Sequence, residues 1–182
     1  MSGKDIFLVI LGIVVANNLV FEGFLGLPVV LGEEKCSKKA LRIGLWVAAI
    51  MILSQAIFCP IGQALTAGSL TFLSDLVAVA VILALVYLGK LVMGDRLGDG
   101  AAVVALNSAV LGLCMNSMDQ CAGFGTAMVN AIGYALGFLG AMLLFAGVKS
   151  RIDEKQVPAP FRGAPILLLA AFIVAMALTA YK

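Results

Sequence analysis

The stretch Asn17-Asn18-Leu19-Val20-Phe21-Glu22 interrupts an otherwise apolar segment that extends over about residues 6–31. A related polar pair, Asn107-Ser108, interrupts a second apolar segment over about residues 100–118. A charged side chain at the centre of a bilayer costs roughly 2.5–3.5 kcal/mol on insertion scales, so such residues usually face a partner or a pathway. Matching polar interruptions in two halves of a chain are typical of a transporter-like or electron-transfer core built on an internal repeat.

The composition identifies an integral membrane protein. Hydrophobic residues make up 63% of the 182 residues, charged residues only 12%, and the mean hydropathy is +1.12. Because the apolar runs are long enough to span a bilayer and do not alternate, the spans should be helices and not barrel strands. The chain contains no histidine, which excludes His-ligated haem, His-containing zinc sites and catalysis by histidine. It also lacks a basic tract, so nucleic acid is not an expected partner.

The apolar runs predict six membrane spans. They cover about residues 6–31, 41–60, 71–94, 100–118, 125–148 and 164–181. Three spans precede residue 96 and three follow it, and an odd number of spans per half forces the second half to run inverted relative to the first. We therefore predict a single all-α membrane domain over residues 1–182. Its six transmembrane helices should form two inverted three-helix repeats, at about 1–96 and 97–182.

The first span is longer than the roughly 20 residues that a straight membrane helix needs. It contains Gly23, Gly26 and Pro28, which weaken a helix. We expect a broken first helix with its non-helical stretch near Glu22–Pro28, and a broken fourth helix at the corresponding place. The weak internal similarity that supports this repeat aligns Asn17-Asn18-Leu19-Val20 with Asn107-Ser108-Ala109-Val110.

Positive charge predicts how the chain lies in the membrane. Ten of the 12 Lys and Arg residues lie in or beside the first, third and fifth loops, and the second and fourth loops carry none. These ten are Lys35, Lys38, Lys39, Arg42, Lys90, Arg96, Lys149, Arg151, Lys155 and Arg162. Because Lys and Arg accumulate on the cytoplasmic side, loops 1, 3 and 5 should be cytoplasmic and both termini should lie outside. The expected location is the inner (cytoplasmic) membrane.

Four stretches resemble a known family. They are Asn17-Asn18-Leu19, Phe24-Leu25-Gly26-Leu27, Asn107-Ser108-Ala109-Val110-Leu111-Gly112 and Val157-Pro158-Ala159-Pro160-Phe161-Arg162-Gly163. They resemble the RnfA/NqrE family, the six-span subunits of the Rnf complex (ferredoxin:NAD oxidoreductase) and of the Na⁺-translocating NADH:quinone reductase. The resemblance covers essentially the whole chain.

The resemblance implies partners, a cofactor and a role. A homologous six-span subunit of opposite orientation, RnfE/NqrD-like, is expected to pair with this one. The pair is expected to hold an iron–sulfur cluster near the middle of the membrane, with two cysteines from each subunit. Flavin- and iron–sulfur-carrying subunits complete such a complex, which couples electron flow to Na⁺ or H⁺ transport. Such a subunit is not catalytic alone.

The chain departs from the family at the cluster ligands. The positions of the two family cysteines are Pro28 and Ser108 here. Proline offers no side-chain ligand, and clusters are held by thiolates, for which a serine oxygen is a poor substitute. We therefore expect the fold without the usual ligation. Cys114, which ends a Leu-Gly-Leu-Cys sequence, is either a relocated ligand or a small apolar residue that packs near a helix end.

Three further features allow more than one interpretation. Cys59 and Cys121 should both lie on the outer side, where a disulfide between them is one possibility. Gly133 and Gly137 form a GxxxG pattern that permits close helix approach, within the subunit or with a partner. The Val157–Gly163 loop, with Arg162, is either a rigid connector or a docking site for a partner.

The polar interruptions set the functional hypotheses. Asn17, Asn18, Glu22, Asn107 and Ser108 are candidates to line an ion pathway at the midplane. The alternative for Asn17, Asn18, Asn107 and Ser108 is to cap broken helices and to hydrogen-bond across spans. The alternative for Glu22 is to pair with a basic group of a partner subunit or to lie near the interface, where it is hydrated. The leading hypothesis is a membrane subunit of an Rnf/Nqr-like ion-translocating electron-transfer complex, contributing to the electron relay, the Na⁺ or H⁺ pathway, or both. The alternatives are a stand-alone small secondary transporter with an inverted-repeat fold and a cofactor-free scaffold subunit.

Overall fold

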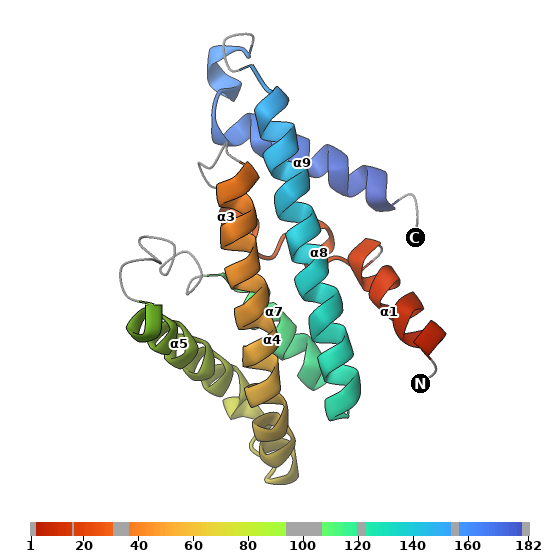
Figure 1. The fold of residues 1–182 in the computed structure, drawn as a ribbon, viewed down its shortest axis with the longest axis vertical. Coiled ribbons are helices and arrows are strands. Elements are labelled where there is room, and N and C mark those ends of the chain that lie inside the picture. Colours follow the sequence, from red (N-terminus) through yellow and green to blue (C-terminus); the bar gives the residue numbers. More distant parts are fainter. Residues whose placement is uncertain are drawn as a thin grey trace.

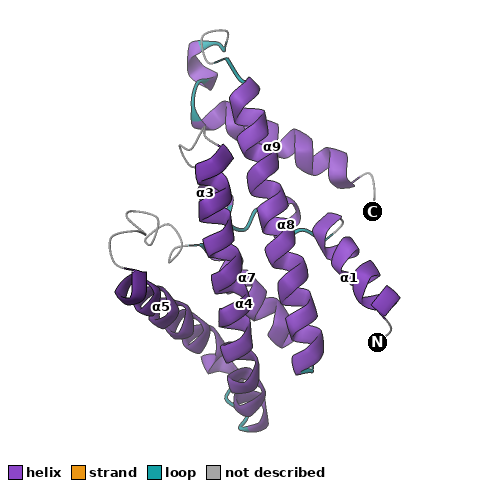
Figure 2. Ribbon diagram, in the orientation of Figure 1, coloured by secondary structure: helices purple, strands orange, loops and turns teal. Residues whose placement is uncertain are grey.

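The structure is a computed structural model that describes residues 3–15, 17–30, 37–93, 107–119, 123–153 and 157–179. Every regular element in these ranges is a helix, which confirms the all-α prediction (Figure 2). The elements are α1 (Gly3–Val15), α2 (Leu19–Gly23), α3 (Leu27–Val30), α4 (Ser37–Ala67), η1 (Thr71–Leu73), α5 (Ser74–Met93), α7 (Ser108–Asp119), α8 (Phe124–Arg151), η3 (Ala159–Phe161) and α9 (Ala164–Thr179).

Three helical segments among the described residues are long and apolar enough to cross a membrane. They are Leu41–Ala67, Thr71–Gly89 and Phe124–Arg151, and Phe7–Gly23 and Ala164–Leu178 are shorter apolar helical stretches. These five segments overlap five of the predicted spans. Of the remaining span, 100–118, residues 100–106 lie outside the described residues, and α7 covers 108–118. The count of six spans in two inverted repeats stays a prediction.

The second span is longer than predicted. Its expected end was residue 60, but α4 continues through Pro60 to Ala67. A proline removes one backbone hydrogen bond of a helix, yet membrane helices tolerate this where neighbouring groups satisfy the freed carbonyl. The prediction was wrong because it treated the proline as a helix end. The helix ends at Ala67, where the Gly68 amide still donates to the Ala64 carbonyl at 3.0 Å.

Helices α4 and α8 form the centre of the molecule and run antiparallel (Figure 1). They approach closely where α4 carries Gly44, since a Cβ there would stand 2.9 Å from Leu139 Cδ2. Fully buried side chains from both helices, among them Met51, Phe138 and Phe145, fill the space around this contact. Helix α1 lies against α8, and α5 and α7 lie against α4.

The outer helices turn large apolar side chains away from this core. Only 17% of the apolar window in Thr71–Gly89 is buried, against 50% in Leu41–Ala67 and 56% in Phe124–Arg151. The exposed side chains include Leu76, Leu83 and Tyr87 on α5, and Phe172 and Ile173 on α9. Apolar exposure on this scale is unusual for a protein in water, but it suits helices that face lipid or a partner helix.

Candidate functional site

The first interruption of the opening span is built by Asn18. Helix α1 ends at Val15, and a backbone bond of 3.0 Å from the Asn17 amide to the Gly12 carbonyl closes its last turn. Asn18 then adopts extended backbone angles and its Oδ1 accepts a bond from the Val20 amide at 3.0 Å. This is an N-cap, in which a side-chain oxygen replaces the missing helical acceptor. The helix therefore breaks earlier than predicted, and Glu22 lies in the short helix α2.

The amide group of Asn18 also connects the break to α8. Its Nδ2 donates to the Val14 carbonyl and to the Gly137 carbonyl, both at 3.0 Å, so the buried side chain is satisfied on both sides. A Cβ at Gly137 would stand 3.0 Å from this nitrogen, and one at Gly133 would stand 3.1 Å from Ile13. The GxxxG pattern therefore packs α8 against α1 within the chain, which decides the question that the sequence left open.

The second interruption, residues 24–26, lies inside the predicted non-helical stretch. Phe24 ends α2 with a φ of 52°, and Gly26 has a φ of 76°. At Gly26 a Cβ would also stand 2.7 Å from Phe138 Cε2 and 2.8 Å from Asn107 Oδ1. Only glycine meets both demands, because left-handed angles disfavour other residues and no space remains for a side chain.

The two polar blocks meet at this turn. The Gly26 amide donates to Ser108 Oγ at 2.8 Å, which joins residues 82 positions apart in the sequence. Asn107 begins α7 as Asn18 begins α2, with its Oδ1 accepting from the amide two residues later at 3.0 Å. The helix starts thus correspond as Asn18 with Asn107, one residue away from the predicted alignment. The correction also pairs Gly23 with Gly112, which follow their caps at equal spacing.

Two buried side-chain amides have polar atoms that lack hydrogen-bond partners in the part of the chain that the structure describes. Asn107 Nδ2 and both polar atoms of Gln55 have no hydrogen-bond partner among the described residues. Gln55 is fully buried near the middle of α4, where an unmatched amide is costly. Sequence reasoning did not select Gln55 as a site residue, because one amide in an apolar helix indicates a hydrogen bond as readily as a ligand.

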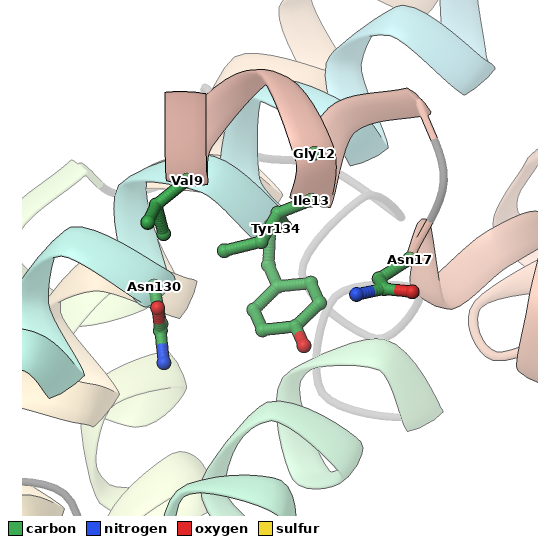
Figure 3. A pocket seen from close by; sticks show the side chains of 6 residues that line it. All are labelled: Val9, Gly12, Ile13, Asn17, Asn130 and Tyr134. Carbon is green, nitrogen blue, oxygen red and sulfur yellow. The ribbon is translucent and has the colours of Figure 1, made fainter. Parts of the chain in front are cut away.

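A cavity of about 310 Å³ lies beside the first break, between α1 and α8 (Figure 3). Its lining residues are Val9, Gly12, Ile13, Asn17, Asn130 and Tyr134. The Tyr134 hydroxyl accepts a bond of 2.8 Å from Asn116 Nδ2 of α7. Asn17, which sequence analysis placed at the midplane, therefore forms part of the cavity wall. Its neighbour Asn18 instead hydrogen-bonds to backbone groups of Val14, Val20 and Gly137.

Comparison with known proteins decides the family. The sequence profile of the Rnf-Nqr membrane-protein family matches residues 6–182. The chain belongs to the Rnf-Nqr family. It is 34% identical over 182 residues to the A-type subunit of the ion-translocating oxidoreductase complex of Syntrophotalea carbinolica, covering 96% of this chain and 94% of the relative.

Two further relatives of this Rnf-Nqr chain align over nearly their full length. The A-type subunit of the Na(+)-translocating ferredoxin:NAD(+) oxidoreductase complex of Acetobacterium woodii is 33% identical over 185 residues, which covers 97% of this chain and 96% of the relative. The A-type subunit of the ion-translocating oxidoreductase complex of Cereibacter sphaeroides is 30% identical over 181 residues, with coverage of 95% and 94%.

The two positions where the Rnf-Nqr resemblance places cluster cysteines do not fit an iron–sulfur cluster. Pro28 lies on α3 and has no donor atom in its side chain. Ser108 already accepts the Gly26 amide through its hydroxyl oxygen. Iron–sulfur clusters use thiolate sulfur, so neither position offers a ligand of the required chemistry. No group of three or more Cys, Asp or Glu side chains that could hold a metal occurs in the described part of the chain.

Cys114 faces the interior of the Rnf-Nqr chain. It is fully buried in a cluster with Phe58 and Ala78, and its sulfur lies 4.0 Å from Ser54 Oγ. This environment suits the packing interpretation, because an apolar pocket inside one protomer gives the thiol no route to a ligand shared with a partner. Cys121 and Cys36 lie outside the described residues, so the disulfide between Cys59 and Cys121 stays a prediction.

The remaining predicted site residues lie at the surface. The Glu22 side chain is exposed on α2, with its backbone amide bonded to the Asn18 carbonyl at 2.8 Å. Arg162 is exposed in the loop after η3, and its Nε donates to the Val157 carbonyl at 2.9 Å. This contact closes the loop on itself, as expected for a rigid connector, and the Arg162 side chain is exposed.

Proposed function

We propose that this chain is the A-type membrane subunit of an Rnf-type complex that couples electron transfer to ion translocation. The observation that carries the proposal is the full-length similarity to subunits named for that role, from residue 6 to residue 182. The contact between the turn that follows α2, at Gly26, and the Asn107-capped start of α7, at Ser108, adds support, since discontinuous helices are typical of the binding sites of transporters. The subunit has no catalytic activity alone.

The proposed partners are the other subunits of such a complex. They are a homologous six-span subunit of opposite orientation (RnfE/NqrD-like) and subunits that carry flavin and iron–sulfur groups. The exposed apolar faces of α5 and α9 are available for helix contacts with the first of these, as well as for lipid. A second candidate function is that of a cofactor-free scaffold subunit. The absence of a thiolate at Pro28 and Ser108 favours it, because neither side chain can ligate a cluster shared with a partner.

The proposed topology has six spans, both termini outside and loops 1, 3 and 5 in the cytoplasm of the cell. Its support comes from charge and from helix direction. Arg42 lies near the start of α4, and Lys149 and Arg151 end α8. Because α4 and α8 are antiparallel, these basic residues gather at one end of the molecule (Figure 1). That end is the cytoplasmic one by the positive-inside rule.

The five polar residues at the breaks divide into two proposed roles. Asn18, Asn107 and Ser108 position backbone, because each accepts a hydrogen bond from a main-chain amide. Glu22 and Asn17 have exposed side chains at the same break. We assign the ion contact to these two, since an exposed carboxylate and amide beside an interrupted helix offer oxygen ligands to a passing Na⁺ or a site for a proton.

The decisive experiment compares Glu22→Gln with Asp75→Asn in the purified, reconstituted complex. Both changes remove one exposed carboxylate, but Asp75 lies at the start of α5, away from the break. Glu22→Gln should lower the number of ions moved per electron pair at least fivefold while electron transfer continues, and Asp75→Asn should change neither. Equal transport by both variants would remove the pathway role from Glu22.

Copurification and iron analysis distinguish the candidates. A member of the proposed complex should purify with flavin- and iron-carrying partners, whereas a stand-alone transporter should move its ion without them. Iron, acid-labile sulfide and the EPR signal should be the same in wild type and Cys114→Ala, because Cys114 is enclosed within its own subunit. A cluster signal abolished by that change would show that Cys114 is a ligand.

A further inference from the structure

The cavity between α1 and α8 combines an apolar wall with a few hydrogen-bonding groups. Val9, Gly12 and Ile13 of α1 form the apolar side. The amides of Asn17 and Asn130 and the phenol of Tyr134 form the polar side, and the Asn17 amide is turned toward Tyr134 (Figure 3). Small-molecule sites in proteins usually have this combination, in which the apolar surface supplies affinity and the polar groups fix orientation.

The charge of the lining indicates a neutral ligand. None of the six lining residues is charged, so the lining offers no cation to a phosphate group. The charge that acts on Tyr134 is the Glu22 carboxylate, which repels an anion further. The Tyr134 oxygen already accepts a bond from Asn116, which leaves its own hydrogen to be donated. The exposed amide of Asn17 adds N–H donors. A carbonyl oxygen is the neutral group that such donors bind.

The position along the helices indicates a ligand from the bilayer. Asn130 and Tyr134 lie about 9 and 15 Å from Phe124 along α8, at 1.5 Å per residue. The 28 residues of α8 exceed a hydrocarbon layer of about 30 Å. If α8 is centred, these two residues lie roughly 3 and 9 Å inside that layer. At this depth the polar head of a membrane amphiphile is joined to its apolar body, so a ligand bound here would come from the bilayer.

We propose that this cavity binds the carbonyl-bearing head of a neutral membrane amphiphile. A volume of about 310 Å³ accepts a ring or a glycerol ester group but not a whole lipid. The apolar body extends outward beside α1, where Leu8 and Leu11 are exposed. Two kinds of molecule carry this chemistry, a lipid-soluble quinone and a neutral glycerolipid. The proposal concerns binding alone and does not depend on which ion the complex moves.

The test uses Gly12, because nothing lies within 4 Å of the place where its Cβ would stand. Gly12→Leu therefore adds an isobutyl group at the cavity wall, and its Cβ meets no other atom within 4 Å. Gly140 of α8 has the same open surroundings but does not line the cavity, so Gly140→Leu is the matched control. Tyr134→Phe removes the donor and keeps the ring. Thermal unfolding of each variant complex checks that the fold is retained.

The probes are a radiolabelled quinone with a ten-carbon tail and radiolabelled dioleoylglycerol, each equilibrated with the purified complex in detergent. We expect saturable binding of at least one probe, at one site per chain. Gly12→Leu should weaken it at least tenfold, Gly140→Leu should leave it unchanged, and Tyr134→Phe should weaken it about fivefold, the effect of one hydrogen bond.

Competition between the probes identifies the source of the ligand: whichever binds more tightly and displaces the other is the better occupant, and both results support the shared carbonyl chemistry. The proposal fails if neither probe saturates. It also fails if Gly12→Leu binds as well as Gly140→Leu, because the cavity would then not be the site.

Discussion

Replacing Gly26 by alanine should destabilise the folded subunit by about 2–5 kcal/mol. The φ of 76° at this position costs a residue with a Cβ roughly 1–2 kcal/mol. The added methyl would also stand 2.7 Å from Phe138 Cε2 and 3.0 Å from the Ala109 Cβ. Overpacking of this kind costs typically about 1–3 kcal/mol in a packed core. Both contributions act on the turn that connects the two polar blocks.

Alanine substitutions at three other glycines distinguish the backbone cost of a positive φ from the packing cost of the added methyl group. Gly163 has a φ of 82° but open surroundings, so Gly163→Ala reports the backbone cost alone. Gly137 has a close contact, 3.0 Å to Asn18 Nδ2, at an ordinary helical φ, so Gly137→Ala reports the packing cost alone. Gly140 has neither feature and serves as the reference.

The assay is equilibrium unfolding of the purified subunit in mixed micelles of mild detergent and SDS, followed by circular dichroism. The expected order of destabilisation is Gly26→Ala first, then Gly163→Ala and Gly137→Ala, with Gly140→Ala neutral or slightly stabilising because alanine favours helices. The reasoning is refuted if Gly26→Ala destabilises no more than Gly163→Ala, because the turn would then have room for a side chain.

The same unfolding assay tests two further changes. Asn18→Ala should cost about 2–4 kcal/mol, because it removes a helix cap and leaves the buried Gly137 carbonyl without its side-chain donor, whereas Asn17→Ala should cost under about 0.5 kcal/mol. Similar losses in the two would contradict the assignment of Asn18 as the cap. Gln55→Met should stabilise the fold by about 1–2 kcal/mol, because it removes a fully buried amide that has no hydrogen-bond partner among the described residues. A loss of stability there would instead mean that Gln55 is satisfied by bound water or by an ion.

Several features of this protein could be read directly from its residues. Long apolar runs with few charges determine a helical membrane protein, because a backbone in the bilayer must satisfy its hydrogen bonds internally and the runs lack the alternation of barrel strands. Gly23, Gly26 and Pro28 predicted a non-helical stretch near Glu22–Pro28, and the second interruption, at residues 24–26, lies within it. Glycine and proline weaken a helix through the backbone itself, so their effect can be predicted without tertiary contacts. The motifs from Asn17 to Gly163 identified the family, which full-length similarity to its members supports.

Other features depended on contacts between residues that are far apart in the chain. Only the tertiary structure shows that the Asn18 amide donates to the Gly137 carbonyl. The same holds for the burial of Cys114 beside Ser54 and for the hydrogen bond from the Gly26 amide to Ser108. The choice of Asn18 over Asn17 as the cap, and the continuation of α4 through Pro60, were settled in the same way. Composition and periodicity are local properties, so they determine which segments become helices. Which faces of those helices meet depends on packing, and a side chain finds its partner only when the fold brings the two together.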